Sequence, residues 1–201
     1  LRLAAAGYDM IGVDLSPEML SVFREKADEL GLSGKVLLLC QDILSMELYG
    51  TIRAAVSTFD TFNHIGPIQQ LEKAFQRVSF FLEPGGWFLF DANTPYKHEQ
   101  ILGDNAYTVE TPDARCDWQN HYDPAGWVDM QLTITDLPSG QVVRESLREY
   151  SYSMETVRAA LDRYGFTLVK VSDGEDFGPV RPDSQRWIFT AVKRYTQEET
   201  V

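Results

Sequence analysis

Residues 7–20 read GYDMIGVDLSPEML, and this stretch decides the fold class. The apolar run MIGVD predicts a β-strand. Ser16 and Pro17 follow it, and a serine cap with a proline in the first turn is typical of a helix start. Apolar residues then recur at helical spacing up to Gly31, where we expect the helix to end. A strand that leads directly into a helix is a basic unit of α/β proteins.

The same alternation continues along the chain. Residues 36–40 read VLLLC, a continuous apolar run typical of a strand buried on both faces. Residues 54–58 predict another buried strand, Pro67 opens a helix with one apolar stripe, and 87–91 (WFLFD) predict the next strand. We therefore predict an α/β fold with a doubly wound, Rossmann-like parallel sheet that carries helices on its faces.

The pattern changes after this core. Between residues 106 and 152 no helical period is found, and apolar residues alternate with polar ones, as in half-buried strands. Turn signals bracket the alternation, so we predict an antiparallel β meander inserted into the core. A helix capped by Ser153 and two strands, 166–172 and 186–192, then close the fold.

These observations predict a division into two parts. Residues 1–96 and 151–201 form the Rossmann-like core, and residues 97–150 form the antiparallel insertion. The insertion is expected to act as a substrate cap or as a dimer contact. Its aromatic residues suit contact with a small ligand or a partner, or packing against the core; they are Trp118, Tyr122 and Trp127.

Composition excludes several classes of partner. The 201 residues include 18 Lys and Arg against 30 Asp and Glu, a net charge of −12, which disfavours nucleic-acid and anionic membrane surfaces. No apolar run approaches the roughly 18 residues of a membrane helix. Cys40 and Cys116 are too far apart for a zinc motif and suit a reducing cytoplasm. We predict a cytoplasmic protein without a metal site.

Carboxylates that follow the predicted strands are candidate ligand contacts, since ligands bind at the carboxyl ends of parallel strands. Asp14 ends the first strand, where it either accepts hydrogen bonds from ribose hydroxyls or supports the helix start. Asp42 follows the next strand, where it either accepts a hydrogen bond from an adenine amine or begins a turn. Both alternatives stay open for each residue.

Four segments together resemble one enzyme family. GYDMIGVDLSPEML (7–20), LLLCQDILSM (37–46), AAVSTFDTFNHI (54–65) and FLEPGGWFLFDANTP (81–95) are similar to the second to fifth strand motifs of class I S-adenosylmethionine-dependent methyltransferases. The resemblance implies methyl transfer from S-adenosyl-L-methionine, with S-adenosyl-L-homocysteine as the product. It also implies a set of cofactor contacts: Asp14 for the ribose, Leu15 and Met19 for the adenosyl pocket, Asp42 and Ile43 for the adenine, and the backbone around Thr58 and Phe59 for the methionine part.

The segment around STFDTFNHI is most similar to small-molecule methyltransferases of the amino-sugar N-methyltransferase type. The resemblance implies a nitrogen or oxygen acceptor in a small molecule and places His64 in the active site as the proton acceptor. The alternative is that His64 caps the helix that begins near Pro67. Other residues at these loops are predicted to contact the substrate: Asn63, Asn93, Tyr96 and Tyr122.

One family feature is missing from the sequence. The glycine-rich loop of the family precedes the helix in which this chain begins, and none of the 14 glycines stands in a GxG arrangement. We therefore expect an N-terminally shortened chain without the first strand and that loop, roughly 30 or more residues by the size of a βαβ unit. This expectation leaves methyl transfer by the shortened chain an open question.

Two other function classes are compatible with the sequence. A carboxylate at the end of a strand also suits a nicotinamide cofactor, so a NAD-dependent oxidoreductase is one alternative. A non-catalytic domain that binds an adenosyl ligand, or that uses the meander as an interaction surface, is the other. The Glu83–Gly86 turn and the two closing strands favour the methyltransferase.

Overall fold

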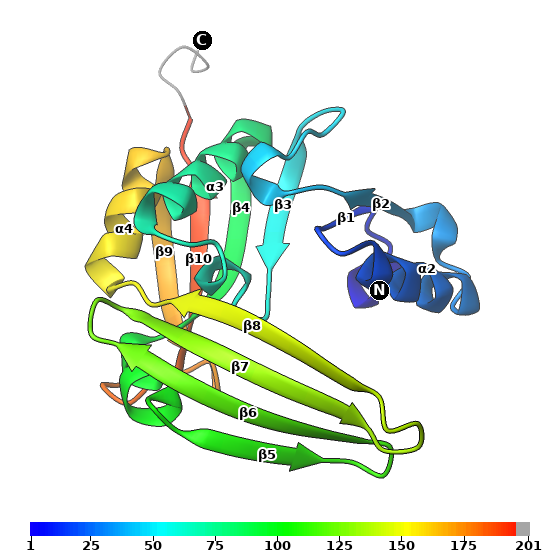
Figure 1. The fold of residues 1–201 in the computed structure, drawn as a ribbon. Helices are drawn as coiled ribbons and strands as arrows, with labels where there is room; N and C mark the ends of the chain where they lie inside the picture. The colour runs from blue at the N-terminus through cyan, green and yellow to red at the C-terminus, as the bar shows by residue number, and fades with distance from the viewer. Residues whose placement is uncertain (196–201) are drawn as a thin grey trace. The chain divides into compact units, whose positions relative to one another are not determined.

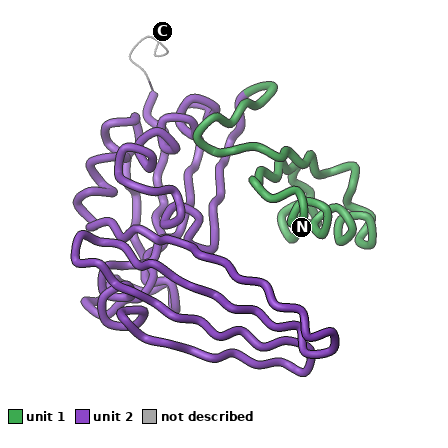
Figure 2. The backbone as a smooth tube through the Cα atoms, in the orientation of Figure 1, with its two compact units in different colours: residues 1–50 green, residues 51–201 purple. Residues whose placement is uncertain are grey.

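The computed structural model describes residues 1–195, and the last six residues of the predicted core segment 151–201 lie outside the described residues. The chain divides into two compact units, Leu1–Gly50 and Thr51–Val201 (Figure 2). This division differs from the predicted separation of core and insertion, which stays a prediction.

Unit 1 consists of a two-stranded parallel sheet and a long helix. Its elements are α1 (Arg2–Ala5), β1 (Met10–Asp14), α2 (Pro17–Glu29), η1 (Ser33–Lys35), β2 (Val36–Cys40) and η2 (Ile43–Ser45). β1 pairs in parallel with β2, and Asp14 lies opposite Cys40. The Ser16 hydroxyl accepts a hydrogen bond from the Met19 amide at 3.1 Å, which caps α2. The predicted strand, helix and second strand are all confirmed.

The prediction that 36–40 is buried on both faces is wrong for this unit. Leu37 is 45% exposed and Cys40 is exposed. α2 packs against β1 and β2, and a single helix covers only one face of a two-stranded sheet. The continuous apolar run therefore has one covered face and one open face within unit 1.

Unit 2 contains a four-stranded mixed sheet (Figure 1). Its strands, in spatial order, are β3 (Ile52–Ser57), β4 (Leu82–Asn93), β10 (Arg186–Lys193) and β9 (Phe166–Asp173). β3 and β4 are parallel, as predicted, whereas β10 runs antiparallel to both of its neighbours. The predicted burial of 54–58 is only partial, since β3 is an edge strand of this sheet and Val56 is 53% exposed.

The core of unit 2 is built from phenylalanines on the helices and the sheet. The two longer helices of this unit are α3 (Ile68–Phe81) and α4 (Met154–Arg163). Phe75 of α3 is completely buried, and its ring centroid lies 5.3 Å from that of Phe62, 5.5 Å from Phe88 and 5.2 Å from Phe90. Phe90 in turn stacks on Phe189 of β10 at 4.7 Å. This cluster fixes α3 on the central strands β4 and β10.

β4 begins earlier than the predicted strand 87–91, because the Glu83–Gly86 segment is already extended. The pairing with β3 shifts register between Ile52 and Ala54. A Cβ at Gly86 would lie 2.8 Å from the Glu83 carbonyl oxygen and 3.0 Å from that of Arg53. Glycine therefore permits the close backbone approach that starts the strand here.

The predicted meander is confirmed as a four-stranded antiparallel sheet. Its strands are β5 (Ala106–Glu110), β6 (Ala114–Asp123), β7 (Trp127–Asp136) and β8 (Val142–Tyr150), paired in that order. Within unit 2 this sheet lies at the carboxyl ends of β3 and β4 (Figure 1). The π-helical η4 (Lys97–Leu102) connects β4 to this sheet, and η3 (Thr61–Asn63) lies between β3 and the helix Ile68–Phe81.

The aromatic residues of the insertion pack mainly within it. Trp118 and Tyr122 contact a buried cluster formed by Leu102, Val128 and Met130. These two side chains therefore pack within the insertion, which differs from the predicted alternative of packing against the α/β core. Among the described residues, no helix is long and apolar enough to cross a membrane.

We predict that Phe75→Ala lowers the free energy of unfolding by about 3–5 kcal/mol, because it leaves a cavity among buried rings. Phe80→Ala is the matched control, since Phe80 is on the same helix and is 67% exposed. We expect the control to cost less than about 1 kcal/mol. Urea denaturation of both variants measures the difference, and equal losses would show that the cluster does not hold α3 in place.

Candidate active site

In unit 1 the two predicted carboxylates lie at the same end of the sheet. Asp14 is the last residue of β1, and Asp42 lies two residues beyond the end of β2, which pairs in parallel with β1. The Asp14 Oδ1 atom accepts a hydrogen bond from the Ser16 amide at 2.9 Å, and the Asp42 Oδ1 atom accepts one from Leu44 at 2.8 Å. Each carboxylate therefore supports a local turn and has a second oxygen that such a contact does not use.

Apolar side chains accompany these carboxylates. Leu15 is 69% exposed and Met19 is 61% exposed, although both are large and apolar. Ile43 is half-buried. Exposed apolar side chains next to carboxylates are the combination that a nucleoside requires, with apolar contact for the base and acceptors for its polar groups.

In unit 2 a strained turn follows β3. Phe59 and Asp60 are not glycines, yet both have left-handed backbones, with φ of 60° and 52°. The Asp91 carboxylate at the end of β4 accepts hydrogen bonds from both amides, at 3.1 Å from Phe59 and 2.9 Å from Asp60. Arg186 of β10 donates to Asp91 and, at 2.9 Å, to the Asp60 carboxylate. Strained residues held in this way are characteristic of functional sites.

Two predicted substrate residues are buried and join three segments. The Asn63 side-chain amide donates to the carbonyl oxygens of Asn93 at 3.2 Å and Tyr150 at 2.8 Å, and its oxygen accepts from the Asn93 amide at 2.8 Å. The Asn93 side chain donates at 2.8 Å to both Asp60 and Glu149. Asn63 is completely buried, and Asn93 is 2% exposed. Both residues therefore occupy positions that fix η3, β4 and β8 together, and their contact with a substrate stays a prediction.

His64 lies at the exposed side of this network. Its side chain is 40% exposed, and its Nε2 atom lies 3.5 Å from Glu149 Oε1 and 3.9 Å from Asp60 Oδ1. No side chain caps α3, whose first turn follows Pro67, so the helix-capping alternative for His64 is wrong. The remaining predicted residues of this unit are more accessible than the two asparagines. Thr58 and Phe59 are exposed, and Tyr96 and Tyr122 are half-buried.

Glu149 is the buried acid of the site. Its Oε2 atom lies 3.1 Å from the Nε2 atom of His98, which is completely buried. Burial alone would raise the pKa of Glu149, but hydrogen bonds from His98 and Asn93 and the proximity of His64 lower it below its ordinary value. Glu149 is therefore a carboxylate at neutral pH, although its side chain is only 8% exposed.

Lys97 completes the charged surroundings. Its ammonium group donates to the Asn93 side-chain oxygen at 2.9 Å. Burial, and secondly the charge of Arg186, lower the pKa of Lys97 against the opposing effect of the carboxylates of Asp60 and Glu149. The site thus places cations and carboxylates within one hydrogen-bonded network.

Three of these residues also meet a geometric criterion for metal binding. Asp60, His64 and Glu149 each place one ligand atom within 4.8 Å of the others. The Asp60 carboxylate is already paired with Arg186 at 2.9 Å, and the positive charges of Arg186 and Lys97 oppose a further cation. These charges disfavour a metal ion at the cluster.

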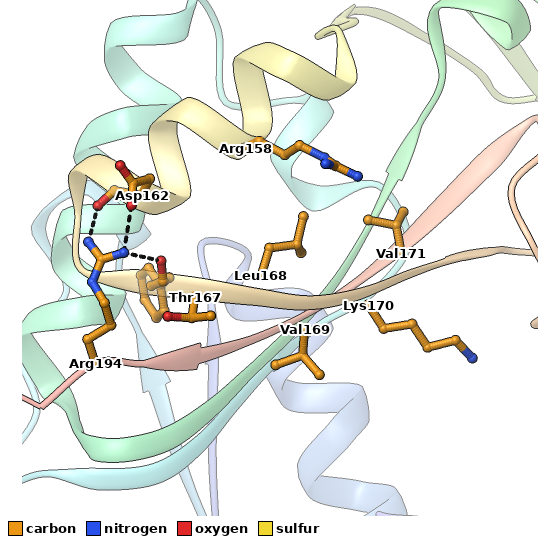
Figure 3. A pocket seen from close by; sticks show the side chains of 9 residues that line it. Arg158, Asp162, Thr167, Leu168, Val169, Lys170, Val171 and Arg194 are labelled. Atoms are coloured by element: carbon orange, nitrogen blue, oxygen red, sulfur yellow. Dashed lines mark hydrogen bonds and ion pairs between the residues drawn. The ribbon is translucent and has the colours of Figure 1, made fainter.

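A separate hollow between α4 and β9 contains none of the predicted site residues (Figure 3). It is lined by Arg158, Asp162, Phe166, Thr167, Leu168, Val169, Lys170, Val171 and Arg194. Arg194 donates to the Asp162 carboxylate at 2.6 Å, so part of its charge is already neutralised. The hollow is distinct from the network around His64.

Sequence reasoning missed most of the charged residues of this network. Asp60 follows β3 and Asp91 lies near the carboxyl end of β4, where carboxylates are candidate ligand contacts. Arg186 begins the last strand, and no local motif in the sequence marks His98 as a site residue. Glu149 had no local signal at all, since its partners are 51 and 56 residues away in the chain.

Comparisons with known proteins agree with this architecture. A family model described as "Methyltransferase domain" matches residues 1–86. The Bacillus subtilis (strain 168) protein named "Putative methyltransferase YqeM" is 27% identical over 202 residues, which cover 98% of this chain and 80% of that protein.

Solved structures extend the likeness to the whole fold. An S-adenosylmethionine-dependent methyltransferase from Clostridium acetobutylicum ATCC 824 has a TM-score of 0.88 and 26% identity, over 96% of this chain and 78% of that one. CalS10, an amino pentose methyltransferase from Micromonospora echinaspora solved with S-adenosylmethionine bound, has a TM-score of 0.65 and 16% identity, over 96% of this chain and 86% of its own.

Together with the fold, these findings support a class I S-adenosylmethionine-dependent methyltransferase. Among the solved structures that share the fold, CalS10 has S-adenosylmethionine bound, and the glycopeptide N-methyltransferase MtfA is described in complex with S-adenosyl-L-homocysteine. The Rossmann-like α/β fold with an antiparallel insertion is confirmed. The findings favour the methyltransferase over the nicotinamide-dependent and non-catalytic alternatives.

We predict that Asp91→Ala lowers the free energy of unfolding by about 1–3 kcal/mol, because two amides and Arg186 lose their shared acceptor. The control is Asp129→Ala, which removes the carboxylate of a more exposed ion pair. In that pair the Asp129 Oδ1 atom lies 2.6 Å from the Arg148 Nε atom. We expect that control to cost less than about 1 kcal/mol. Urea denaturation compares the two, and a loss at Asp91 no larger than at Asp129 would contradict the assigned role.

Proposed function

We propose that this enzyme transfers the methyl group of S-adenosyl-L-methionine to a nitrogen of a small molecule, with His64 as the proton acceptor. The observation that carries the proposal is the partly exposed His64 imidazole beside a buried carboxylate, Glu149, 3.5 Å away. An oxygen acceptor fits the same chemistry less well, because a neutral amine is the better nucleophile at neutral pH. The amino pentose methyltransferase CalS10, which shares the fold, acts on a substrate of this class by its description.

The rate of this reaction depends more on the alignment of the nucleophile with the methyl group than on acid–base catalysis. The acceptor nitrogen attacks the methyl carbon in line, the N–C bond forms as the C–S bond breaks, and S-adenosyl-L-homocysteine departs. The nitrogen then carries one proton too many, and the His64 imidazole accepts it. Holding the nucleophile and the methyl group in line supplies a large part of the rate, so the rigid turn at Phe59 and Asp60 is as relevant as the base.

In unit 1, the proposal assigns the adenosyl contacts. The free oxygen of Asp14 accepts hydrogen bonds from the ribose hydroxyls, and that of Asp42 accepts one from the adenine amine. The exposed side chains of Leu15 and Met19 and the half-buried Ile43 give apolar contact to the nucleoside. Support comes from the position of both carboxylates at the carboxyl end of a parallel pair of strands.

We assign the contacts with the methionine moiety and with the methyl acceptor to residues of unit 2. The backbone around Thr58 and Phe59 contacts the methionine moiety, and Asn63, Asn93, Tyr96 and Tyr122 form the substrate side. Asn63 and Asn93 are buried, so they act on the substrate through the neighbouring side chains that they hold in place. The antiparallel insertion 97–150 then serves as a substrate cap, with a dimer contact as the alternative role. A cytoplasmic location, suggested by two unpaired cysteines, is part of the same proposal.

The direct test is methyl transfer from radiolabelled S-adenosyl-L-methionine to a panel of small primary amines, amino sugars and matched alcohols. Label in the amines and not in the alcohols is the expected result. Transfer to proteins or nucleic acids in place of small molecules would overturn the substrate class. Transfer to the alcohols alone would overturn the preference for nitrogen.

We predict that Asp14→Asn weakens S-adenosyl-L-homocysteine binding by about 10-fold or more, because an amide is a poorer acceptor for two ribose hydroxyls than a carboxylate. Calorimetric titration measures the dissociation constant. Asp9→Asn is the control with the same charge change, at a residue whose side chain is 87% exposed. An equal effect of the two substitutions would contradict the ribose contact.

We predict that His64→Gln lowers kcat by roughly 10²-fold or more, in the range for loss of an acid–base group, and leaves S-adenosyl-L-homocysteine affinity unchanged. Steady-state kinetics with the best amine of the panel and calorimetry provide the two readouts. His121→Gln is the control, since His121 is 76% exposed in the insertion. An unchanged kcat in His64→Gln would show that proton removal does not need this residue.

A further inference from the structure

Glu149 presents its two carboxylate oxygens to different partners. The Oε2 atom faces the His98 ring nitrogen at 3.1 Å and the Asn93 amide at 2.8 Å, both of which are buried. The Oε1 atom faces His64 Nε2 at 3.5 Å. One oxygen is thus held by two fixed donors, and the other is aimed at the imidazole that the proposed function uses.

The His98 ring shows why Glu149 cannot rotate freely. Its Nε2 atom faces an oxygen that has only lone pairs, so this nitrogen carries the proton. Its Nδ1 atom has no hydrogen-bond partner among the described residues. A buried N–H group without a partner costs more free energy than a buried lone pair, so Nδ1 is the unprotonated nitrogen. His98 and Asn93 are therefore two donors of fixed direction that lock the orientation of the carboxylate.

We propose that Glu149 is a positioning residue that holds His64 in the tautomer with its proton on Nε2, which leaves Nδ1 as the atom that accepts the substrate proton. The inference rests on the proposed function, in which His64 is the base. A carboxylate accepts hydrogen bonds and donates none, so a neutral imidazole beside it turns its N–H toward it. Histidines in enzymes are commonly oriented in this way by a carboxylate behind the ring.

The other charged groups around His64 favour the same arrangement. Asp60 Oδ1 lies 3.9 Å from the same ring nitrogen, beyond hydrogen-bond distance, so both carboxylates near the ring lie on its Nε2 side. The Asp60 carboxylate forms an ion pair with Arg186, and the Lys97 ammonium group donates a hydrogen bond to the Asn93 side-chain oxygen. Asp91 is engaged by Arg186 and the strained turn. Glu149 is therefore the acceptor at shorter distance from His64.

The test uses the tautomer of His64, read from the ¹⁵N chemical shifts of the neutral rings in the full chain labelled at histidine. The His64→Gln and His121→Gln variants assign the signals. The expected result for the unsubstituted protein is a proton on Nε2 of His64. A proton on Nδ1 would overturn the inference, and this measurement needs no variant of Glu149.

Glu149→Gln sharpens the test. The donors His98 and Asn93 hold the amide oxygen at the Oε2 position, so the amide NH₂ group faces His64 and donates to its Nε2 atom. We expect the His64 proton to move to Nδ1, kcat to fall about 10²-fold or more, and S-adenosyl-L-homocysteine affinity to stay unchanged. Glu145→Gln is the control, on the same strand and the same face but exposed.

The outcomes separate the inference from the proposed function. An unchanged tautomer in Glu149→Gln would overturn the positioning role even if kcat fell. An inverted tautomer with full activity would overturn the use of Nδ1 as the acceptor. If His64→Gln is fully active, the proposed function loses its base, whereas the tautomer measurement still decides whether Glu149 orients the ring.

Discussion

The Asp91 carboxylate is the acceptor on which the rest of the site depends. Two consecutive residues, Phe59 and Asp60, have left-handed backbones that cost of order 1–3 kcal/mol each. Asp91 accepts both of their amide hydrogens, and Arg186 of β10 holds that carboxylate in turn. The end of β4 and the start of β10 therefore stabilise a turn that the chain would not adopt alone.

The consequence of this turn is a continuous chain of hydrogen bonds. It places Asp60 where Asn93 donates to it, and the same Asn93 amide group donates to Glu149, which faces His64. Each member is attached to the end of a strand or to a short segment locked by a buried side chain. The carboxylate beside His64 therefore has little freedom to move, and the reaction that we propose depends on such fixed alignment.

The sequence predicted the strands and helices of the fold well. It predicted less well which elements lie next to one another. Strands and helices such as β1, α2 and α3 follow from local apolar spacing, and the meander follows from alternation. The open face of β2 and the antiparallel β10 do not follow from local pattern, because neighbours in space decide burial and direction. At the site, His64 came from a resemblance, whereas Glu149 depends on how the end of β8 meets β4, which no local pattern encodes.

The partners of Glu149 explain why this carboxylate suits a role beside a titratable group. A buried carboxylate is costly unless it is compensated, and the strongest compensation is an arginine. Here the arginine of the site, Arg186, is committed to Asp91 and Asp60. Within residues 1–195, Glu149 accepts hydrogen bonds from His98 and Asn93, which hold it in place without cancelling its charge. Its remaining charge faces the His64 imidazole at 3.5 Å, the group to which our proposed function assigns the substrate proton.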